Sequence, residues 1–211
     1  MKAITVLSHY MKSELEAVGV AATKTTVIPP FVYGLDGLAP PDGLAPPDGL
    51  APPDGPPCVL FAGRLVAAKG VDDAIEAWRM SGLELPLVLA GTGSLRSEVG
   101  DMDRGEGLGG EPHHRIAAVI GRAQVLVMPS RWQEPFGIVG LEALSLNTPV
   151  AAWRSGGVPE WHPGGELLVD WGDIDALAAA LRAAVGQRAT PAQGFDRELL
   201  MDQLVALYEN R

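Results

Sequence analysis

From residue 58 onward, short apolar runs alternate with segments of helical periodicity, and this alternation constrains the fold more than any other feature. A helix between two strands carries the chain back across a sheet, so the pattern predicts parallel strands with helices on both faces. We therefore expect an α/β fold with a Rossmann-like parallel sheet. The expected strands are 59–62, 85–90, 125–128, 150–153 and 167–169, and the expected helices are 70–80, 95–99, 114–122, 137–146 and 174–185.

A shorter unit and a repeat precede this region. We expect a strand at 3–7, a helix at 9–17 capped by Ser8, and a strand at 24–28. The six residues Asp-Gly-Leu-Ala-Pro-Pro then occur three times, at 36–41, 42–47 and 48–53. Paired prolines favour an extended chain and cannot form the ladder of a solenoid, which makes this segment a linker. The expected divisions are 1–31, a linker at 32–57, a parallel-sheet domain at 58–190, and a C-terminal helix at 191–211.

Charge and cysteine content exclude several classes of function. The 16 basic and 26 acidic side chains give a net charge of −10, which argues against a nucleic-acid partner and requires any anion site to be local. The single Cys58 provides neither a disulfide framework nor a thiol cluster, which favours the cytoplasm, and no apolar run is long enough to cross a membrane. The histidines are not spaced like metal ligands. Asp101 and Asp103 are a pair of carboxylates that could formally hold a divalent ion, but they lie in a Gly-rich acidic run at 100–111. We interpret this run as a solvated loop, so we expect no metal site.

The stretch 129–142 is the strongest candidate for a ligand site. A helix opens near Gly137, and the first backbone N–H groups of a helix suit an anion such as a phosphate. Glu142 follows Ile138 by four positions, and helical side chains lean toward the N-terminus, so its carboxylate would lie where the sugar of a nucleotide follows the phosphate. Glu134, in the loop before the helix, would face the same space from the other side.

Within this stretch the residues Ser130, Glu134, Phe136, Gly137, Leu141, Glu142 and Ala143 form the pattern Ser-x-x-x-Glu-x-Phe-Gly-x-x-x-Leu-Glu-Ala. The pattern resembles the signature of retaining GT-B glycosyltransferases of family four, and the resemblance covers residues 58 to about 186. It implies that these residues form the C-terminal, donor-binding half of a GT-B fold. The donor implied is a UDP- or GDP-sugar, with no cofactor and no metal required. Glu142 would then anchor the ribose, Glu134 would orient the hydroxyls of the donor sugar, and the donor would also contact Phe136, Gly137, Ile138 and Val139.

Two cations follow the first strand of this domain, in the loop Gly63 to Gly70. Arg64 and Lys69 could clamp a diphosphate, because Arg binds bidentately and Lys acts as a point charge. Taken alone they fit a solvated surface pair equally well. The same spacing occurs in the diphosphate-binding loop of the family resembled, so we expect Arg64 and Lys69, together with Glu134, to be the catalytic residues. A Gly-x-Gly turn around Thr92 lines the donor cleft of that family, which adds Thr92 to the expected donor-binding residues.

Other features depart from the family pattern or fit it less specifically. Gly156 to Glu160 resembles a family turn, which is either a tight turn entering a short helix or a ligand contact. At 107–110, glycines stand where the family has a strand contacting the base. Residues 1–31 resemble only the tail of the acceptor domain, so strand 3–7 is expected to be unpaired. The segment 195–208 is expected to expose an apolar stripe of Leu199, Leu200, Leu204 and Leu207. Such surfaces invite association, which predicts a homo-oligomer or a partner chain that supplies the acceptor domain.

The leading hypothesis is a glycosyltransferase that transfers a hexose from a nucleotide diphosphate sugar to an unknown acceptor with retention of configuration. A non-catalytic nucleotide-sugar-binding module, or an inactive fragment, is the alternative. An epimerase or phosphorylase on the same fold fits less well, since no lysine is placed for a pyridoxal Schiff base and the acceptor-domain carboxylates of an epimerase are missing.

Overall fold

A computed structural model describes residues 3–32, 55–95, 105–110 and 112–209 of the chain. The three hexapeptide repeats, nearly all of the expected helix at 95–99, and Asp101 and Asp103 lie outside the described residues. None of the helices in the described ranges is both long and apolar enough to cross a bilayer.

The centre of the molecule is a six-stranded parallel sheet with the strand order β5-β4-β3-β6-β7-β8. This confirms the expected α/β architecture. The strands are β3 (Cys58–Ala62), β4 (Leu87–Ala90), β5 (Gly105–Gly109), β6 (Ala123–Met128), β7 (Val150–Trp153) and β8 (Leu168–Val169). Short 3-10 helices lie at η3 (Ala67–Lys69), η5 (Val158–Glu160) and η6 (Gly165–Leu167).

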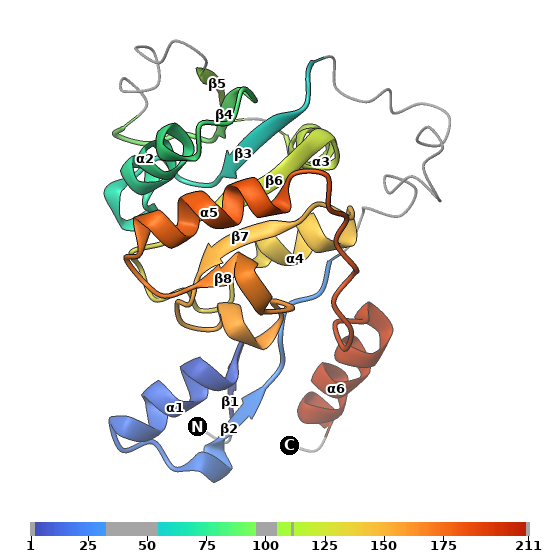
Figure 1. Ribbon diagram of the computed structural model, residues 1–211. Helices are drawn as coiled ribbons and strands as arrows, with labels where there is room; N and C mark the ends of the chain where they lie inside the picture. Colours follow the sequence, from blue (N-terminus) through green and yellow to red (C-terminus); the bar gives the residue numbers. More distant parts are fainter. Residues whose placement is uncertain (1–2, 33–54, 96–104, 111, 210–211) are drawn as a thin grey trace.

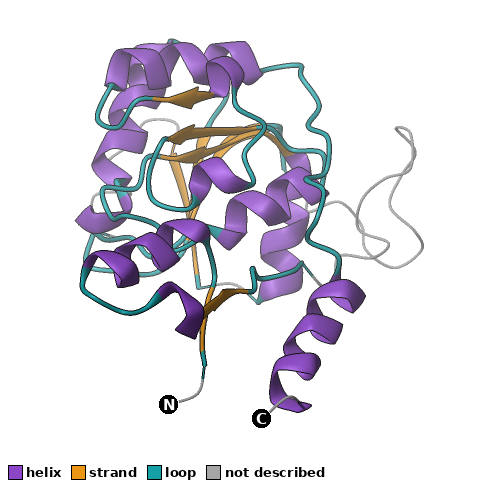
Figure 2. Cartoon of the chain, turned by 90° about the horizontal axis from the view of Figure 1, so that it is seen from below, coloured by secondary structure: helices purple, strands orange, loops and turns teal. Residues whose placement is uncertain are grey.

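Helices cover both faces of this sheet, as Figures 1 and 2 show. The side chains of a strand alternate between its two faces, and β3 therefore sends Val59 and Phe61 into one core and Cys58 and Leu60 into the other. The first core is closed by α2 (Val71–Ser81) and α5 (Ile174–Ala184), and the second by α3 (His113–Arg122) and α4 (Ile138–Ser145). Strands buried on both faces read as continuous apolar runs, which is why their positions could be predicted.

Strand β5 corrects the interpretation of residues 105–109 as part of a solvated loop that lacks the family's strand. Leu87 to Ala90 of β4 pair in parallel with Gly105 to Gly109, with an irregularity in register between Leu89 and Ala90. The pairing uses backbone groups alone, so a glycine-rich edge strand needs no apolar pattern. Sequence periodicity therefore gave no signal for it.

The first unit consists of β1 (Ile4–Val6), α1 (His9–Ala17), η1 (Ala22–Lys24) and β2 (Thr25–Val27). The expectation that strand 3–7 is unpaired was wrong, because β1 pairs in parallel with β2. The predicted Ser8 cap is present, with its hydroxyl accepting from the Met11 N–H at 3.1 Å. Both carboxylate oxygens of Glu160 accept backbone N–H groups of α1, from His9 and from Tyr10 at 2.8 Å each, which ties α1 to the turn that carries η5.

The last helix, α6 (Arg197–Glu209), lies beside the β1–β2 unit (Figures 1 and 2). The expected apolar stripe is only partly exposed. Leu200 is buried and Leu204 and Leu207 are half-buried, whereas Leu199 is exposed.

Candidate functional site

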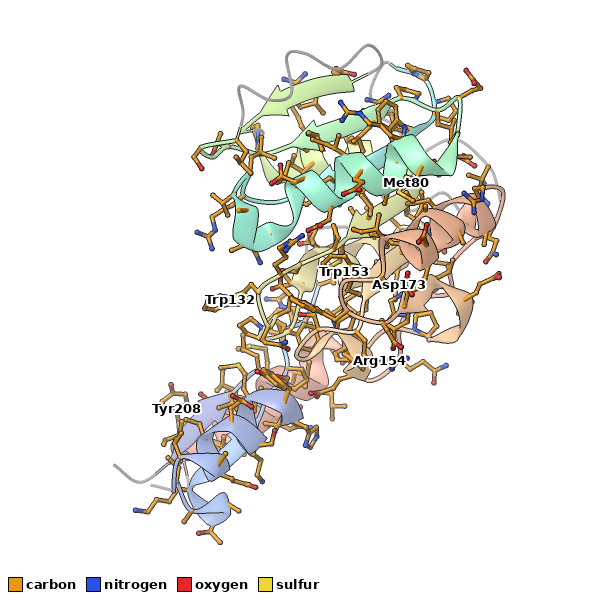
Figure 3. All side chains as sticks on the ribbon, turned by 60° about the vertical axis from the view of Figure 1, so that its left-hand side comes forward. Met80, Trp132, Trp153, Arg154, Asp173 and Tyr208 are labelled. Carbon is orange, nitrogen blue, oxygen red and sulfur yellow. The ribbon has the colours of Figure 1, made fainter. Side chains whose placement is uncertain are left out.

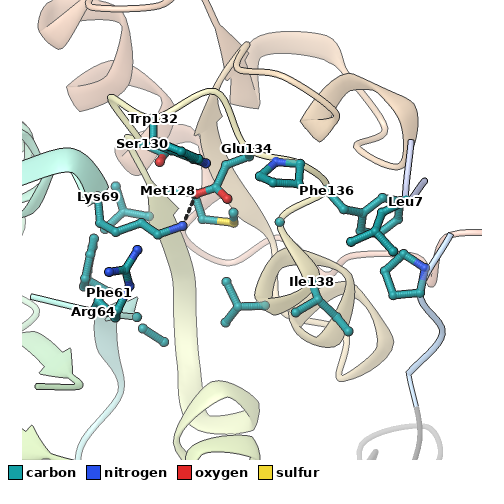
Figure 4. A pocket seen from close by; sticks show the side chains of 17 residues that line it. Leu7, Phe61, Arg64, Lys69, Met128, Ser130, Trp132, Glu134, Phe136 and Ile138 are labelled. Carbon is teal, nitrogen blue, oxygen red and sulfur yellow. Dashed lines mark hydrogen bonds and ion pairs between the residues drawn. The ribbon is translucent and has the colours of Figure 1, made fainter. Parts of the chain in front are cut away.

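A cavity of about 560 Å³ opens at the carboxyl ends of β3 and β6, where ligands bind in sheets of this type. One wall is the loop after β3, which carries Arg64 and Lys69, and the facing wall is the loop and helix start after β6 (Figure 4). Of the expected site residues, the cavity is lined by Arg64, Lys69, Glu134, Phe136, Gly137, Ile138 and Val139.

Lys69 and Glu134 meet between the two walls. The Lys69 Nζ lies 2.5 Å from the Glu134 Oε1, and the Glu134 side chain is 8% exposed (Figure 4). Gly70 makes this position of Lys69 possible, because it adopts a left-handed conformation and a Cβ there would lie 1.8 Å from the Pro129 carbonyl oxygen. The ion pair of Lys69 with Glu134 therefore depends on a close approach of the backbone between the loops that follow β3 and β6.

The loop that carries Glu134 is held through its backbone by residues distant in sequence. Four backbone carbonyls of this loop, at residues 132, 134, 135 and 136, accept hydrogen bonds from the first unit and from the turn at 155–161. The pairs are Trp132 O with Ser155 Oγ at 2.7 Å, Glu134 O with Gly157 N at 2.8 Å, Pro135 O with Ser8 Oγ at 2.5 Å, and Phe136 O with Trp161 Nε1 at 2.6 Å. The turn from Gly156 to Glu160 is thus a tight turn that enters η5 and positions the site loop from behind.

A second set of contacts fixes the start of the loop to η3 and α2. The Arg131 guanidinium binds both carboxylate oxygens of the buried Asp73, at 2.6 Å each. These hydrogen bonds raise the pKa of Arg131. The Trp132 N–H donates to the Ala68 carbonyl at 2.9 Å. The loop is therefore a rigid platform for Glu134.

Helix α4 begins at the cavity. Gly137 is its N-cap in a left-handed conformation with φ of 86°, and Ile138 and Val139 also line the cavity. The first N–H groups of an α-helix have no partner within the helix, so the start of α4 beside Lys69 and Arg64 is a favourable arrangement for an anion.

Thr92 and Glu142 are not brought to the cavity wall. The Thr92 carbonyl accepts from the Leu65 N–H at 2.8 Å, and the Thr92 side chain is exposed. Glu142 is half-buried on the second turn of α4. Thr92 follows β4, which lies on the far side of β3 from β6, whereas the cavity opens at the ends of β3 and β6. Glu142 lies one turn beyond the residues at the start of α4 that line the cavity.

Sequence reasoning missed several residues of the cavity wall, among them Leu7, Pro30, Phe61, Met128 and Trp132. A signal existed for two of them. Leu7 and Pro30 follow the parallel strands β1 and β2, so the rule that sites lie at carboxyl ends of strands applies to the first unit as well. Among the described residues, no group of three or more His, Cys, Asp or Glu side chains could hold a metal ion.

Comparison with known proteins identifies the family. The family model for glycosyl transferases group 1 matches residues 47–193. This chain belongs to the glycosyl transferases group 1 family. Its relatives include a glycogen synthase of Mycobacterium tuberculosis, which is 34% identical over 143 residues, covering 62% of this chain and 34% of that protein. A GDP-mannose-dependent phosphatidylinositol monomannoside mannosyltransferase of Mycolicibacterium smegmatis is 30% identical over 197 residues, covering 84% of this chain and 51% of that protein.

Solved structures place this group 1 chain in the GT-B fold. Sucrose-phosphate synthase of Thermosynechococcus elongatus matches with a TM-score of 0.76 and 26% identity, over 99% of this chain and 58% of that one. Anabaena HepE in complex with UDP and glucose matches with a TM-score of 0.79 and 20% identity, over 100% of this chain and 64% of that one. The chain spans about a third to a half of the length of these two curated relatives and about three fifths of these two solved chains.

Proposed function

We propose that this chain is the donor-binding part of a retaining family-four glycosyltransferase, which transfers a hexose from a UDP- or GDP-sugar to an acceptor. The observation that carries the proposal is the meeting of Lys69 and Glu134 in a cavity that Arg64 and the start of α4 also line. A nucleotide sugar needs cationic and N–H contacts for its diphosphate and a carboxylate for its hydroxyls. This cavity offers both within one space.

In the proposed complex, Arg64, Lys69 and the N–H groups at Gly137 to Val139 bind the diphosphate. As the glycosidic bond breaks, negative charge grows on the diphosphate, and these groups stabilise it without a metal ion. In the structure Lys69 is paired with Glu134. When Lys69 binds the diphosphate instead of Glu134, the Glu134 carboxylate becomes available to the hydroxyls of the donor sugar.

Two further residues extend this proposal beyond the cavity wall. Glu142, on the second turn of α4, accepts hydrogen bonds from the ribose hydroxyls, because it lies behind the helix start that binds the phosphates. Thr92 follows β4 and borders the donor cleft.

The acceptor-binding region is supplied by another part of the protein, by a second copy or by a partner chain. We place the activity in the cytoplasm. Cys58, the single cysteine, is buried, and burial raises its pKa to about 11, so its thiol is unreactive.

The test is a calorimetric screen of UDP-, GDP- and ADP-sugars, followed by NMR of the product formed with candidate acceptors and partner proteins. The proposal expects one UDP- or GDP-sugar to bind, and it expects the anomeric configuration of the donor to be kept in the product. A product with inverted configuration, or binding of none of these nucleotide sugars, would refute it.

A second candidate is a module that binds the nucleotide sugar without transferring it. It rests on the same cavity, because the contacts proposed for the diphosphate and the sugar would bind the donor whether or not transfer follows. Binding without turnover, in the presence of every candidate partner and acceptor, would favour this second function.

A further inference from the structure

Trp132 differs from the other tryptophans of the chain in having no evident structural role. Trp78, Trp153 and Trp161 are buried, at 6%, 1% and 4% exposure. Trp171 is half-exposed, but its indole N–H donates to the Ser130 carbonyl at 3.2 Å and its ring packs on Trp153 with centroids 5.8 Å apart. Trp132 is 55% exposed as a residue, and its indole N–H makes none of the hydrogen bonds found among the described residues.

The backbone of Trp132 is nevertheless fixed on both sides. Its N–H donates to the Ala68 carbonyl at 2.9 Å, and its carbonyl accepts from the Ser155 hydroxyl at 2.7 Å. A large aromatic side chain is therefore presented to solvent from a rigid loop. Ordering this ring against a ligand costs little conformational entropy, because only two side-chain torsions remain free.

The ring also lies at the proposed donor site. Trp132 lines the same cavity as Lys69 and Glu134, and it precedes Glu134 by two residues (Figure 4). Figure 3 shows its side chain extending outward from the body of the protein. A group stacked on Trp132 would therefore lie at the rim, beside the sugar that Glu134 orients.

We propose that Trp132 is a binding residue for the acceptor, stacking on the apolar face of a pyranose ring in an acceptor saccharide. The C–H groups on one face of a pyranose are polarised by the neighbouring oxygens, and they are attracted to the negative face of an indole ring. The hydroxyls at the edge of the sugar stay free for water and for polar groups at the rim. The inference rests on the proposed function, since it assigns the inner part of the cavity to the donor and its rim to the acceptor.

The donor sugar is a second source of the same pyranose chemistry. The rim position and the outward direction of Trp132 favour the acceptor, because the diphosphate anchors the donor between Arg64, Lys69 and the helix start. A test must therefore measure free saccharides and donor separately.

The experiment is saturation-transfer NMR on the full chain with methyl α-glucoside, methyl α-mannoside and maltose, each with and without UDP or GDP. Calorimetry of UDP, GDP, UDP-glucose and GDP-mannose runs in parallel. The variants are Trp132→Ala, Trp132→Phe as the conservative rescue, and Tyr208→Ala as the control. Tyr208 is an exposed aromatic residue on α6 that does not line the cavity.

The proposal expects saturation of the C–H protons on one face of a saccharide, and a roughly tenfold loss of saccharide affinity in Trp132→Ala. Trp132→Phe should recover most of this loss, Tyr208→Ala should bind normally, and the affinity for nucleoside diphosphates should be unchanged in all three. Equal saccharide binding by Trp132→Ala and the parent would overturn the proposal, as would a loss confined to UDP-glucose or GDP-mannose, or no saccharide binding to the parent. A parent that binds saccharides but no nucleotide would count against the proposed function only.

Discussion

Ser8 and Pro135 are 127 positions apart in sequence, and the Ser8 hydroxyl donates to the Pro135 carbonyl at 2.5 Å. The same hydroxyl accepts from the Met11 N–H and caps α1. One side chain therefore joins the first unit of the chain to the loop that carries Glu134. Gly157 makes room for this contact, because a Cβ at Gly157 would lie 2.9 Å from the Ser8 Cβ.

Replacing Ser8 with Ala should lower the free energy of unfolding by roughly 2 kcal/mol. The change removes a helix cap and leaves a part-buried carbonyl without its donor. Urea denaturation measures the effect. Ser13→Ala is the matched control, because the exposed Ser13 hydroxyl only donates to the Tyr10 carbonyl of its own helix. Equal stability of the two variants would show that the contact with Pro135 contributes little.

Two helical glycines should respond to alanine in opposite directions. A Cβ at Gly140 of α4 would lie 2.0 Å from Trp161 Cη2 and 2.8 Å from Met128 Sδ, so Gly140→Ala should destabilise the protein by about 1–3 kcal/mol through overpacking. A methyl group added at Gly121 of α3 would meet no heavy atom within 4 Å, apart from its own helix backbone and chain neighbours. Gly121→Ala should therefore stabilise the protein by about 0.5–1 kcal/mol.

Thermal unfolding of both variants beside the parent tests this pair. A stabilised Gly140→Ala variant would mean that Trp161 can move aside. That result would also weaken the view that Trp161 fixes the Phe136 carbonyl and, through it, the start of α4.

His162 should make the stability of the fold fall in mild acid. Its Nδ1 accepts from the Gly164 N–H at 2.9 Å, which leaves the proton on Nε2 for the Val150 carbonyl at 2.8 Å. Burial lowers the pKa of His162, in opposition to the smaller effect of the Val150 hydrogen bond. The unfolded chain therefore takes up a proton first as pH falls, so stability is full above about pH 6.5 and is lost toward the lowered pKa of the folded state.

Urea midpoints between pH 8 and pH 5 measure this dependence. His162→Gln should flatten the curve over that range, whereas His9→Gln, at an exposed position, should follow the parent. A parent curve that His162→Gln leaves unchanged would assign the acid sensitivity to other groups.

Local signals predicted two elements with their observed bounds. The Ser8 cap marked the start of α1, which buries no residue, and a fully buried apolar run marked β7. Strand β5 was missed, because its glycines form it through backbone pairing with β4. The pairing of β1 with β2 was also missed. The expectation that strand 3–7 is unpaired came from the resemblance of residues 1–31 to the tail of an acceptor domain, and not from the residues of the two strands.

The gathering of the candidate residues at one cavity was predictable, whereas the contacts that hold the site loop in place were not. Two cations and a helix start at strand ends could be expected to meet, and Arg64, Lys69 and Gly137 line one cavity. The contacts that hold the site loop join residues far apart in sequence, such as Ser8 with Pro135 and Arg131 with Asp73. No local pattern encodes such pairs, so only the structure reveals them.

The central claim is that Arg64 and Lys69 hold a diphosphate against the start of α4, and calorimetry of the preferred nucleoside diphosphate tests it most directly. In the proposed complex each cation makes charge-assisted bonds to the diphosphate, which contribute about 1.5–3 kcal/mol each, so Arg64→Ala and Lys69→Ala should each weaken binding about tenfold or more. Arg79 is an exposed cation on α2 that does not line the cavity, so the control variant Arg79→Ala should bind like the parent. Parent-like affinity in both cavity variants would contradict the account.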